Sequence, residues 1–197
     1  MIAIIDYGTG NLKSIRNGFL KVGADATITR DPYKIEKADA LVLPGVGAFG
    51  RAMKHLEDYK ELIHDYINTG KPFLGVCLGL QLLFTKSQED KYIEGLDVFK
   101  GDVLRLPEGV KIPHIGWNNL KIANECPILN NIGNDYVYFV HSYYVKPENE
   151  NIIAATTDYG TDITAAVCKD NVFATQFHPE KSGEIGLNIL RNFVKEI

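Results

Sequence analysis

A cysteine lies at the centre of an apolar stretch whose residue types suit nucleophilic chemistry. Residues 72–84 read PFLGVCLGLQLLF, in which Cys77 has Gly75 and Gly79 two positions away on either side. The pattern G-x-C-x-G, between a strand-like and a helix-like segment, is the thiol form of a nucleophile elbow. A β-carbon at either glycine would meet neighbouring backbone. The pattern predicts a nucleophilic thiol, with helix N–H groups that favour the thiolate and hold an oxyanion.

A thiol nucleophile needs a base, and one of the five histidines has a suitable neighbour. His178 lies in the sequence QFHPE, directly after the strand-like VFAT. Pro179 stiffens this segment. Glu180 is placed to accept a hydrogen bond from one ring nitrogen while the other nitrogen faces the thiol. The sequence therefore predicts a catalytic triad of Cys77, His178 and Glu180.

Other common chemistries lack the spacing that they need. There is no C-x-x-C pair and no H-E-x-x-H, so a zinc site has no ligand set and no metal is expected. The turn GTGNLKS resembles a dinucleotide-binding turn, but Lys13 stands where G-x-G-x-x-G needs its third glycine. The same turn is not a P-loop. We therefore expect chemistry without a cofactor.

Strand and helix signals alternate in the first half of the chain. The ranges that read as strands are 2–6, 26–29, 40–44 and 73–76, and those that read as helices are 11–23, 49–69 and from about Leu80 onward. This alternation predicts a parallel sheet covered on both faces. Such sheets bind ligands at the carboxyl ends of their strands, where the cysteine turn lies.

Strand signals are more closely spaced in the second half. They fall at 117–122, 136–145, 152–157, 163–168 and 172–177. We expect these strands to extend the sheet in antiparallel fashion. The predicted fold is α/β, a flavodoxin-like three-layer sandwich with a central, mostly parallel sheet extended by antiparallel strands.

Composition favours one globular domain over residues 1–197. The chain has 197 residues, 45% of them hydrophobic and 23% charged, which is enough for a substantial core. The net charge of -4 and the absence of a Lys/Arg cluster argue against a nucleic-acid partner. Three widely spaced cysteines suit a reducing compartment. No signal-peptide core or membrane-length apolar run is apparent, so we expect a cytoplasmic protein without a membrane partner.

Motifs along the whole chain carry a family resemblance. GVCLGLQ with the distant FHPE resembles the class I glutamine amidotransferases. LPGVGAFG at 43–50, PHIGWN at 113–118, YVYFVHSYY at 136–144 and QFHPEKSG at 176–183 resemble, more narrowly, the glutaminase subunits of imidazole glycerol phosphate synthase. The resemblance runs from IAIIDYGTGN to the last helix.

The resemblance implies hydrolysis of glutamine to glutamate and ammonia. The triad would act through a glutamyl thioester on Cys77. The N–H of Leu78 should be one oxyanion donor, and Val46 or Gly47 in the PGVG loop should supply the other. The residues implied in substrate binding are Gly45, Gln81, Glu89, His141, Ser142 and Tyr143.

The resemblance also implies a partner. In this family, ammonia passes into the β/α barrel of a cyclase subunit, which makes imidazole glycerol phosphate and an aminoimidazole carboxamide ribonucleotide in histidine biosynthesis. A dry conduit keeps ammonia from becoming ammonium, which lacks the lone pair. We expect a heterodimer with this subunit, with an interface around the site that includes Asn11, Trp117, Tyr136 and Lys181, the tryptophan serving as an anchor.

The PGVG loop suggests a means of regulation. Val46 is β-branched and stiff, whereas the glycines beside it permit a peptide flip. We predict that ligand binding in the partner turns the Val46 amide inward and completes the oxyanion hole.

Three other interpretations remain. Another class I glutaminase, serving anthranilate, carbamoyl phosphate, GMP or pyridoxal phosphate synthesis, would not account for PGVG and PHIGWN. A cysteine hydrolase or deglycase of flavodoxin-like fold would not account for H-P-E or Gln81. A non-enzymatic binding module gives no reason to retain the triad. Labelling of Cys77 by iodoacetamide or a diazo-ketone glutamine analogue would separate such a module from an enzyme.

Overall fold

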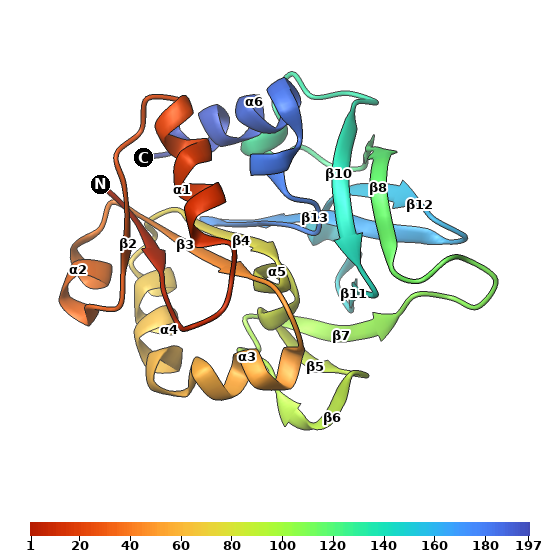
Figure 1. The fold of residues 1–197 in the computed structure, drawn as a ribbon, viewed down its shortest axis with the longest axis horizontal. Helices are drawn as coiled ribbons and strands as arrows, with labels where there is room; N and C mark the ends of the chain where they lie inside the picture. The colour runs from red at the N-terminus through yellow and green to blue at the C-terminus, as the bar shows by residue number, and fades with distance from the viewer.

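The computed structural model describes residues 1–197, apart from the side chain of Lys91. The chain forms an α/β fold with helices on both faces of a long central sheet and two smaller sheets at one end (Figure 1). In the described chain, no helix combines the length and apolarity required to cross a bilayer.

The first half of the chain builds the parallel part of the central sheet. Its strands lie in the order β2-β1-β3-β4 and are all parallel; they are β1 (Ile2–Ile5), β2 (Ala26–Thr29), β3 (Ala40–Gly45) and β4 (Phe73–Cys77). The helices of this half are α1 (Leu12–Lys21), α2 (Pro32–Lys37), α3 (Phe49–His55), α4 (Lys60–Asn68) and α5 (Leu78–Leu82), with the 3-10 turn η1 (Glu57–Tyr59). β1, β3 and β4 are buried throughout, as continuous apolar runs in a doubly covered sheet should be.

The chain after residue 120 completes the central sheet. β14 (Val172–Thr175) lies parallel to β4, and the antiparallel strands β13 (Asp162–Lys169), β12 (Ile153–Asp158) and β9 (Lys121–Ile122) follow it. The remaining helical segments are η2 (Pro127–Leu129), η3 (Glu150–Ile152), η4 (Pro179–Lys181) and α6 (Gly183–Val194). The predicted antiparallel extension is therefore confirmed for β13, β12 and β9.

Two smaller sheets stand at the end of the central one. β8 (His114–Asn119) and β10 (Tyr136–His141) form an antiparallel ribbon. The other sheet has the order β11-β7-β5-β6, from β5 (Phe84–Ser87), β6 (Asp90–Glu94), β7 (Phe99–Arg105) and β11 (Tyr143–Pro147). The chain passes from the ribbon to this sheet at Ser142, which brings both sheets close to the end of β4.

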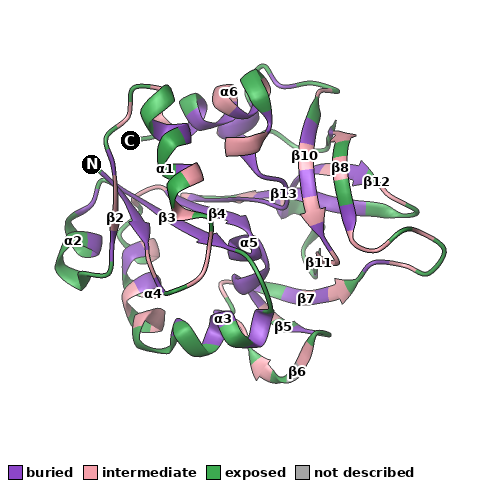
Figure 2. Cartoon of the chain, viewed as in Figure 1, coloured by how far each residue is buried: buried purple, intermediate pink, exposed green. Residues whose placement is uncertain are grey.

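Two apolar cores cover the two faces of the central sheet. Helices α2, α3, α4 and α5 contribute to one core, which includes Phe49 and Tyr66. Helices α1 and α6 contribute to the other, in which the Phe19 and Phe193 ring centroids lie 6.0 Å apart. The buried residues run through the middle layer, as Figure 2 shows. The predicted three-layer arrangement is confirmed.

Several predicted elements differ from the structure. The single helix at 49–69 is broken at Leu56 and η1, because the chain must turn for the apolar sides of both α3 and α4 to reach one core. The strand at 136–145 is two strands in different sheets, and the segment at 117–122 divides between β8 and β9. β14 is parallel to its neighbour β4, not antiparallel. The sequence patterns did not indicate α2, β5, β6 or β7.

Candidate active site

The turn after β4 has the strained geometry of a nucleophile elbow. Cys77 has φ 56° and ψ −106°, in the left-handed region that side chains other than glycine rarely adopt. A β-carbon at Gly79 would lie 1.9 Å from the Leu43 carbonyl oxygen, and one at Gly75 would lie 3.0 Å from the Gly79 carbonyl oxygen. Gly79 is therefore required by close backbone approach, and a β-carbon at Gly75 would be tightly packed, in line with the sequence pattern.

The substitution Gly79→Ala should destabilise the protein. Since the new β-carbon meets a backbone oxygen, the strand or the helix start must shift, and we expect the free energy of unfolding to fall by about 1–3 kcal/mol. Gly133→Ala is the matched control, because a β-carbon there has no described atom within 4 Å. Urea denaturation compares the two variants. Equal stability of Gly79→Ala and Gly133→Ala would contradict the tight packing of this turn.

The site lies at the ends of three adjacent parallel strands, β3, β4 and β14. Gly45 at the end of β3 lies opposite Cys77, and Thr175 at the end of β14 lies opposite Val76. The loop after β3, the elbow after β4 and the segment after β14 therefore meet at one edge. This is the carboxyl edge at which open α/β sheets bind ligands.

The predicted base and its orienting carboxylate are in contact. His178 Nδ1 lies 2.8 Å from Glu180 Oε1, with side-chain exposures of 3% and 2%. Burial acts to lower the pKa of His178, but the neighbouring Cys77 and Glu180 outweigh it and raise that pKa to about 9. Among the described residues, His178 Nε2 has no hydrogen-bond partner. The imidazole is therefore a strengthened base with one nitrogen occupied and the other available.

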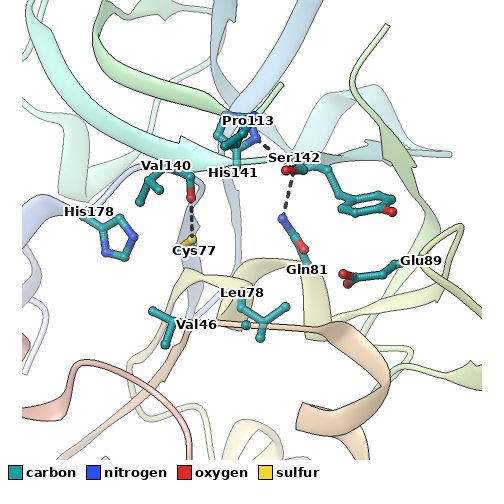
Figure 3. A pocket seen from close by; sticks show the side chains of 12 residues that line it. Val46, Cys77, Leu78, Gln81, Glu89, Pro113, Val140, His141, Ser142 and His178 are labelled. Carbon is teal, nitrogen blue, oxygen red and sulfur yellow. Dashed lines mark hydrogen bonds between the residues drawn. The ribbon is translucent and has the colours of Figure 1, made fainter. Parts of the chain in front are cut away.

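The thiol has a carbonyl acceptor from the ribbon. Cys77 Sγ donates to the Val140 carbonyl oxygen on β10 at 3.8 Å, and His178 lies to the left of the same sulfur in Figure 3. Val140 lies within the motif YVYFVHSYY, but its residue type does not single it out, because its contact depends on where the ribbon crosses the elbow. The thiol proton thus has a resting acceptor other than the triad histidine.

A pocket opens beside the sulfur. Its volume is about 280 Å³, and its lining residues are Val46, Gly47, Cys77, Leu78, Gln81, Glu89, Pro113, Val140, His141, Ser142, Tyr143 and His178. The structure therefore brings together the residues predicted for the oxyanion hole and all but one of those predicted for substrate binding. Pro113 and Val140 lie within motifs that the sequence analysis quotes, but neither was predicted as a site residue.

The exception is Gly45. It does not belong to the described pocket lining. A β-carbon at this position would lie 2.6 Å from the Tyr7 hydroxyl and 2.8 Å from the Leu78 β-carbon. Gly45 therefore allows the PGVG loop to pack closely against the elbow. In the same loop, Val46 is 41% exposed and Gly47 has φ +101°.

Two polar side chains lie in the pocket at the end away from His178 (Figure 3). Gln81 is 5% exposed, and its Nε2 donates to the Tyr143 carbonyl oxygen at 2.9 Å. Glu89 Oε2 accepts from the Phe49 N–H at 2.8 Å. The Glu89 carboxylate is thereby held beside the start of α3 and points toward Gln81, where it can attract an ammonium group.

Two neutral histidines, His114 and His141, form a hydrogen-bonded pair beside the part of the pocket lined by residues 141–143. Burial lowers the pKa of His141 and of His114 to about 4 in each case. Because the Tyr143 carbonyl only accepts, the His141 Nδ1–H donates to it at 2.9 Å. His141 Nε2 is then an acceptor for the His114 Nδ1–H at 3.0 Å. This fixed chain of donors orients the segment through Ser142 that lines the pocket.

The four residues predicted for the interface are exposed or half-buried. Trp117 and Tyr136 lie on the ribbon and are 55% and 60% exposed. Asn11 is exposed and borders a small cavity that His178 and Glu180 also line. Lys181 is half-buried in η4, next to the triad carboxylate. An exposed tryptophan and tyrosine on one ribbon are typical of protein–protein contact surfaces.

Comparison with known proteins gives consistent matches over the whole chain. The family model for class I glutamine amidotransferases matches residues 3–197. A protein from Methanothermobacter thermautotrophicus, named imidazole glycerol phosphate synthase subunit HisH, is 58% identical over 197 residues, with 100% of this chain and 99% of the relative covered. A protein of the same name from Caldanaerobacter subterraneus subsp. tengcongensis is 56% identical over 196 residues, with 98% and 97% covered.

Solved structures share the fold at low sequence identity. One described as a glutamine amidotransferase has a TM-score of 0.79 at 19% identity and covers 100% of this chain and 98% of its own. The Thermotoga maritima PurLQS structure has a TM-score of 0.78 at 18% identity, with 98% and 97% covered. These two matches concern the arrangement of helices and strands.

Proposed function

Because this chain belongs to the class I glutamine amidotransferase family, we propose that it hydrolyses glutamine to glutamate and ammonia as the glutaminase subunit of an imidazole glycerol phosphate synthase in histidine biosynthesis. The observation that carries the proposal is the strained Cys77 elbow beside the buried His178–Glu180 pair, at the mouth of a small polar-ended pocket. The names of the HisH relatives support the choice of synthase.

The first half of the reaction acylates the thiol. Cys77 gives its proton to His178, and the sulfur attacks the side-chain carbonyl carbon of glutamine. The C=O electron pair moves to the oxygen, which the Leu78 N–H and an N–H of the Val46–Gly47 loop stabilise. The tetrahedral adduct then collapses, the C–N bond breaks, and His178 gives its proton to the departing nitrogen. Ammonia leaves and a glutamyl thioester remains.

The second half regenerates the enzyme. Water attacks the thioester carbonyl and gives a proton to His178, the C–S bond breaks, and the thiol takes the proton back. Throughout, Glu180 keeps the Nδ1–H oriented, so that Nε2 faces the sulfur. Glu89 and Gln81 hold the amino-acid end of glutamine, with the backbone of residues 141–143 on the opposite wall.

The ammonia goes to a partner in this proposal. The relatives are named as subunits, which supports action within a larger enzyme. We propose a heterodimer with a cyclase subunit of β/α-barrel fold, docked over the surface that carries Asn11, Trp117, Tyr136 and Lys181. Docking there encloses the mouth of the pocket and directs ammonia into the partner instead of into water.

Glutamate release in three mixtures tests the function and its regulation. The mixtures are this chain alone, this chain with the cyclase subunit, and both with the nucleotide acceptor. We expect low activity from the chain alone and strong activation in the full mixture, because the Val46 amide completes the oxyanion hole only when the partner is occupied. One missing oxyanion donor is worth about 10²–10³ in rate.

The outcomes separate the two parts of the proposal. High activity of the chain alone would retain the glutaminase and reject control by the Val46 amide. No activity in any mixture, from protein with a cooperative unfolding transition, would reject the synthase assignment.

A further inference from the structure

A buried amide that the proposed mechanism does not use lies beside the nucleophile. Gln176 is 0% exposed, and its side-chain Nε2 lies 3.8 Å from the Cys77 sulfur. Its position follows from strand register, because Thr175 pairs with Val76 and the next residue of each parallel strand comes to the same level. Gln176 is not part of the described pocket lining, so it approaches the sulfur from the protein interior.

The hydrogen-bond network determines which end of this amide faces the sulfur. The Tyr143 carbonyl oxygen can only accept, so the Gln81 atom 2.9 Å from it must be Nε2. The same Nε2 lies 3.1 Å from the Gln176 side chain, whose atom at that contact must be Oε1. The other terminal atom of Gln176 is therefore Nε2, a donor directed at Cys77.

We propose that Gln176 is a positioning residue for the nucleophile, whose N–H donates to the Cys77 sulfur and favours the thiolate over the thiol. The inference rests on Cys77 being the nucleophile of the proposed function. A donor interacts more strongly with a charged acceptor than with a neutral one, and more strongly still in a buried site. The thiol form instead gives its hydrogen to the Val140 carbonyl.

The same amide couples the nucleophile to the substrate side of the pocket. Gln81 donates to Gln176 Oε1, and Gln81 itself lines the glutamine pocket. Hydrogen bonds in such a chain polarise one another, so the bond accepted at Oε1 strengthens the donation from Nε2. The order of donation is Gln81 to Gln176 to Cys77. Ordering of Gln81 by bound glutamine therefore assists the sulfur through one intervening residue.

The titratable groups around the sulfur come from several elements. His178 and Glu180 follow β14, His141 lies on β10, and Glu89 follows β5. Tyr7 follows β1, and burial raises the pKa of Tyr7 to about 12. His141 is neutral well above pH 4, so neither it nor Tyr7 changes charge near neutral pH. The Gln176 amide carries no charge, so its effect should appear as a displacement of the whole pH profile.

The rate of alkylation by iodoacetamide tests the inference on the full chain. The Cys77 peptide is quantified by mass spectrometry as a function of pH. In Gln176→Leu, which removes the donor at similar volume, we expect the pH midpoint to rise by about one unit and the rate at neutral pH to fall about tenfold. In Gln176→Glu, which keeps an acceptor for Gln81 but adds an acidic group beside the sulfur, we expect a larger rise.

Asn192→Ala is the control for loss of a buried amide. Asn192 lies on α6 and donates to the Ile128 and Asn130 carbonyl oxygens, outside the glutamine pocket. We expect a lower melting temperature in this variant with an unchanged alkylation midpoint. A change of midpoint in Asn192→Ala equal to that in Gln176→Leu would attribute the effect to general loosening and overturn the inference.

Two further outcomes are distinguishable. If Gln176→Leu does not fold, the test rests on Gln176→Glu alone. An unchanged pH midpoint of Cys77 alkylation in Gln176→Glu would overturn the role of Gln176 and leave the proposed function intact. If Cys77 of the parent chain reacts no faster than Cys126 and Cys168, the nucleophile assignment fails and the inference fails with it.

Discussion

Replacement of the thiol in Cys77→Ala is expected to lower glutamate release by about 10⁴-fold or more, because no other group can form the thioester. Alanine keeps a β-carbon at φ 56°, so the turn remains as strained as in the parent and the loss reports on the sulfur alone. The measurement is glutamate formed from glutamine by the chain together with the cyclase subunit and the nucleotide acceptor.

Cys126→Ala and Cys168→Ala are the matched controls. Neither cysteine lines the pocket in the described structure, and each variant should keep its activity within about twofold of the parent. If Cys77→Ala retained more than a tenth of the parent activity, hydrolysis would proceed without a covalent intermediate and the proposed mechanism would be wrong.

Glu180→Gln is expected to lower the turnover rate by about 10³–10⁴-fold with little change in volume. The carboxylate accepts from His178 Nδ1 at 2.8 Å, which leaves Nε2 to receive the thiol proton. An amide can present its NH₂ group to Nδ1 instead and place the ring proton on Nε2, which can then no longer act as a base. Steady-state rates of glutamate release in the full complex measure the effect.

The pH dependence supplies a second readout for Glu180→Gln. Loss of the carboxylate removes one of the groups that raise the pKa of His178 to about 9, so the pH range over which His178 gains and loses its proton, and with it the pH profile of activity, should move to lower pH. Because the pKa of His178 is higher in the folded state than in the unfolded chain, protonation of His178 stabilises the fold. This contribution is fully present below about pH 6.5 and is lost as the pH rises to about 9. Stability of the parent should therefore decline over that range, and that of the variant less steeply.

Glu184→Gln is the matched control, because it changes the net charge by the same amount as Glu180→Gln. Its carboxylate is 77% exposed on α6 and lies 3.6 Å from Arg191, where an ion pair contributes little. Unchanged activity and pH profile are expected. An equal loss in Glu184→Gln and Glu180→Gln would attribute the effect to net charge and contradict orientation of His178.

Local patterns predicted the parts of the molecule that depend on neighbouring residues. The spacing of glycines around Cys77 indicates a turn with no room for β-carbons, and the structure has such a turn. The two-residue separation of His178 and Glu180 predicts their contact, which is present. Apolar runs such as 40–44 and 73–76 predict buried parallel strands because burial on both faces leaves no polar alternation.

The parts that sequence patterns missed depend on long-range register. The run at 136–145 is apolar and aromatic throughout, and only Ser142 hints at the change of sheet. The contact of the Val140 carbonyl with Cys77 cannot be predicted from residue types, because every residue has a backbone carbonyl. Gln176 did leave a signal, because an amide that ends an apolar strand run must find partners if it is buried.

The place of β14 in the central sheet has a consequence for synthesis of the chain on the ribosome. β14 lies between β4 and β13, yet most of the second half of the chain is made after β4 and before it. During synthesis, one edge of β4 therefore stays unpaired until β14 and the His178 segment leave the ribosome. Pairings between such distant segments form slowly, and open strand edges favour aggregation. Ammonia production therefore depends on both halves of the chain, because no fragment that ends before His178 contains both nucleophile and base.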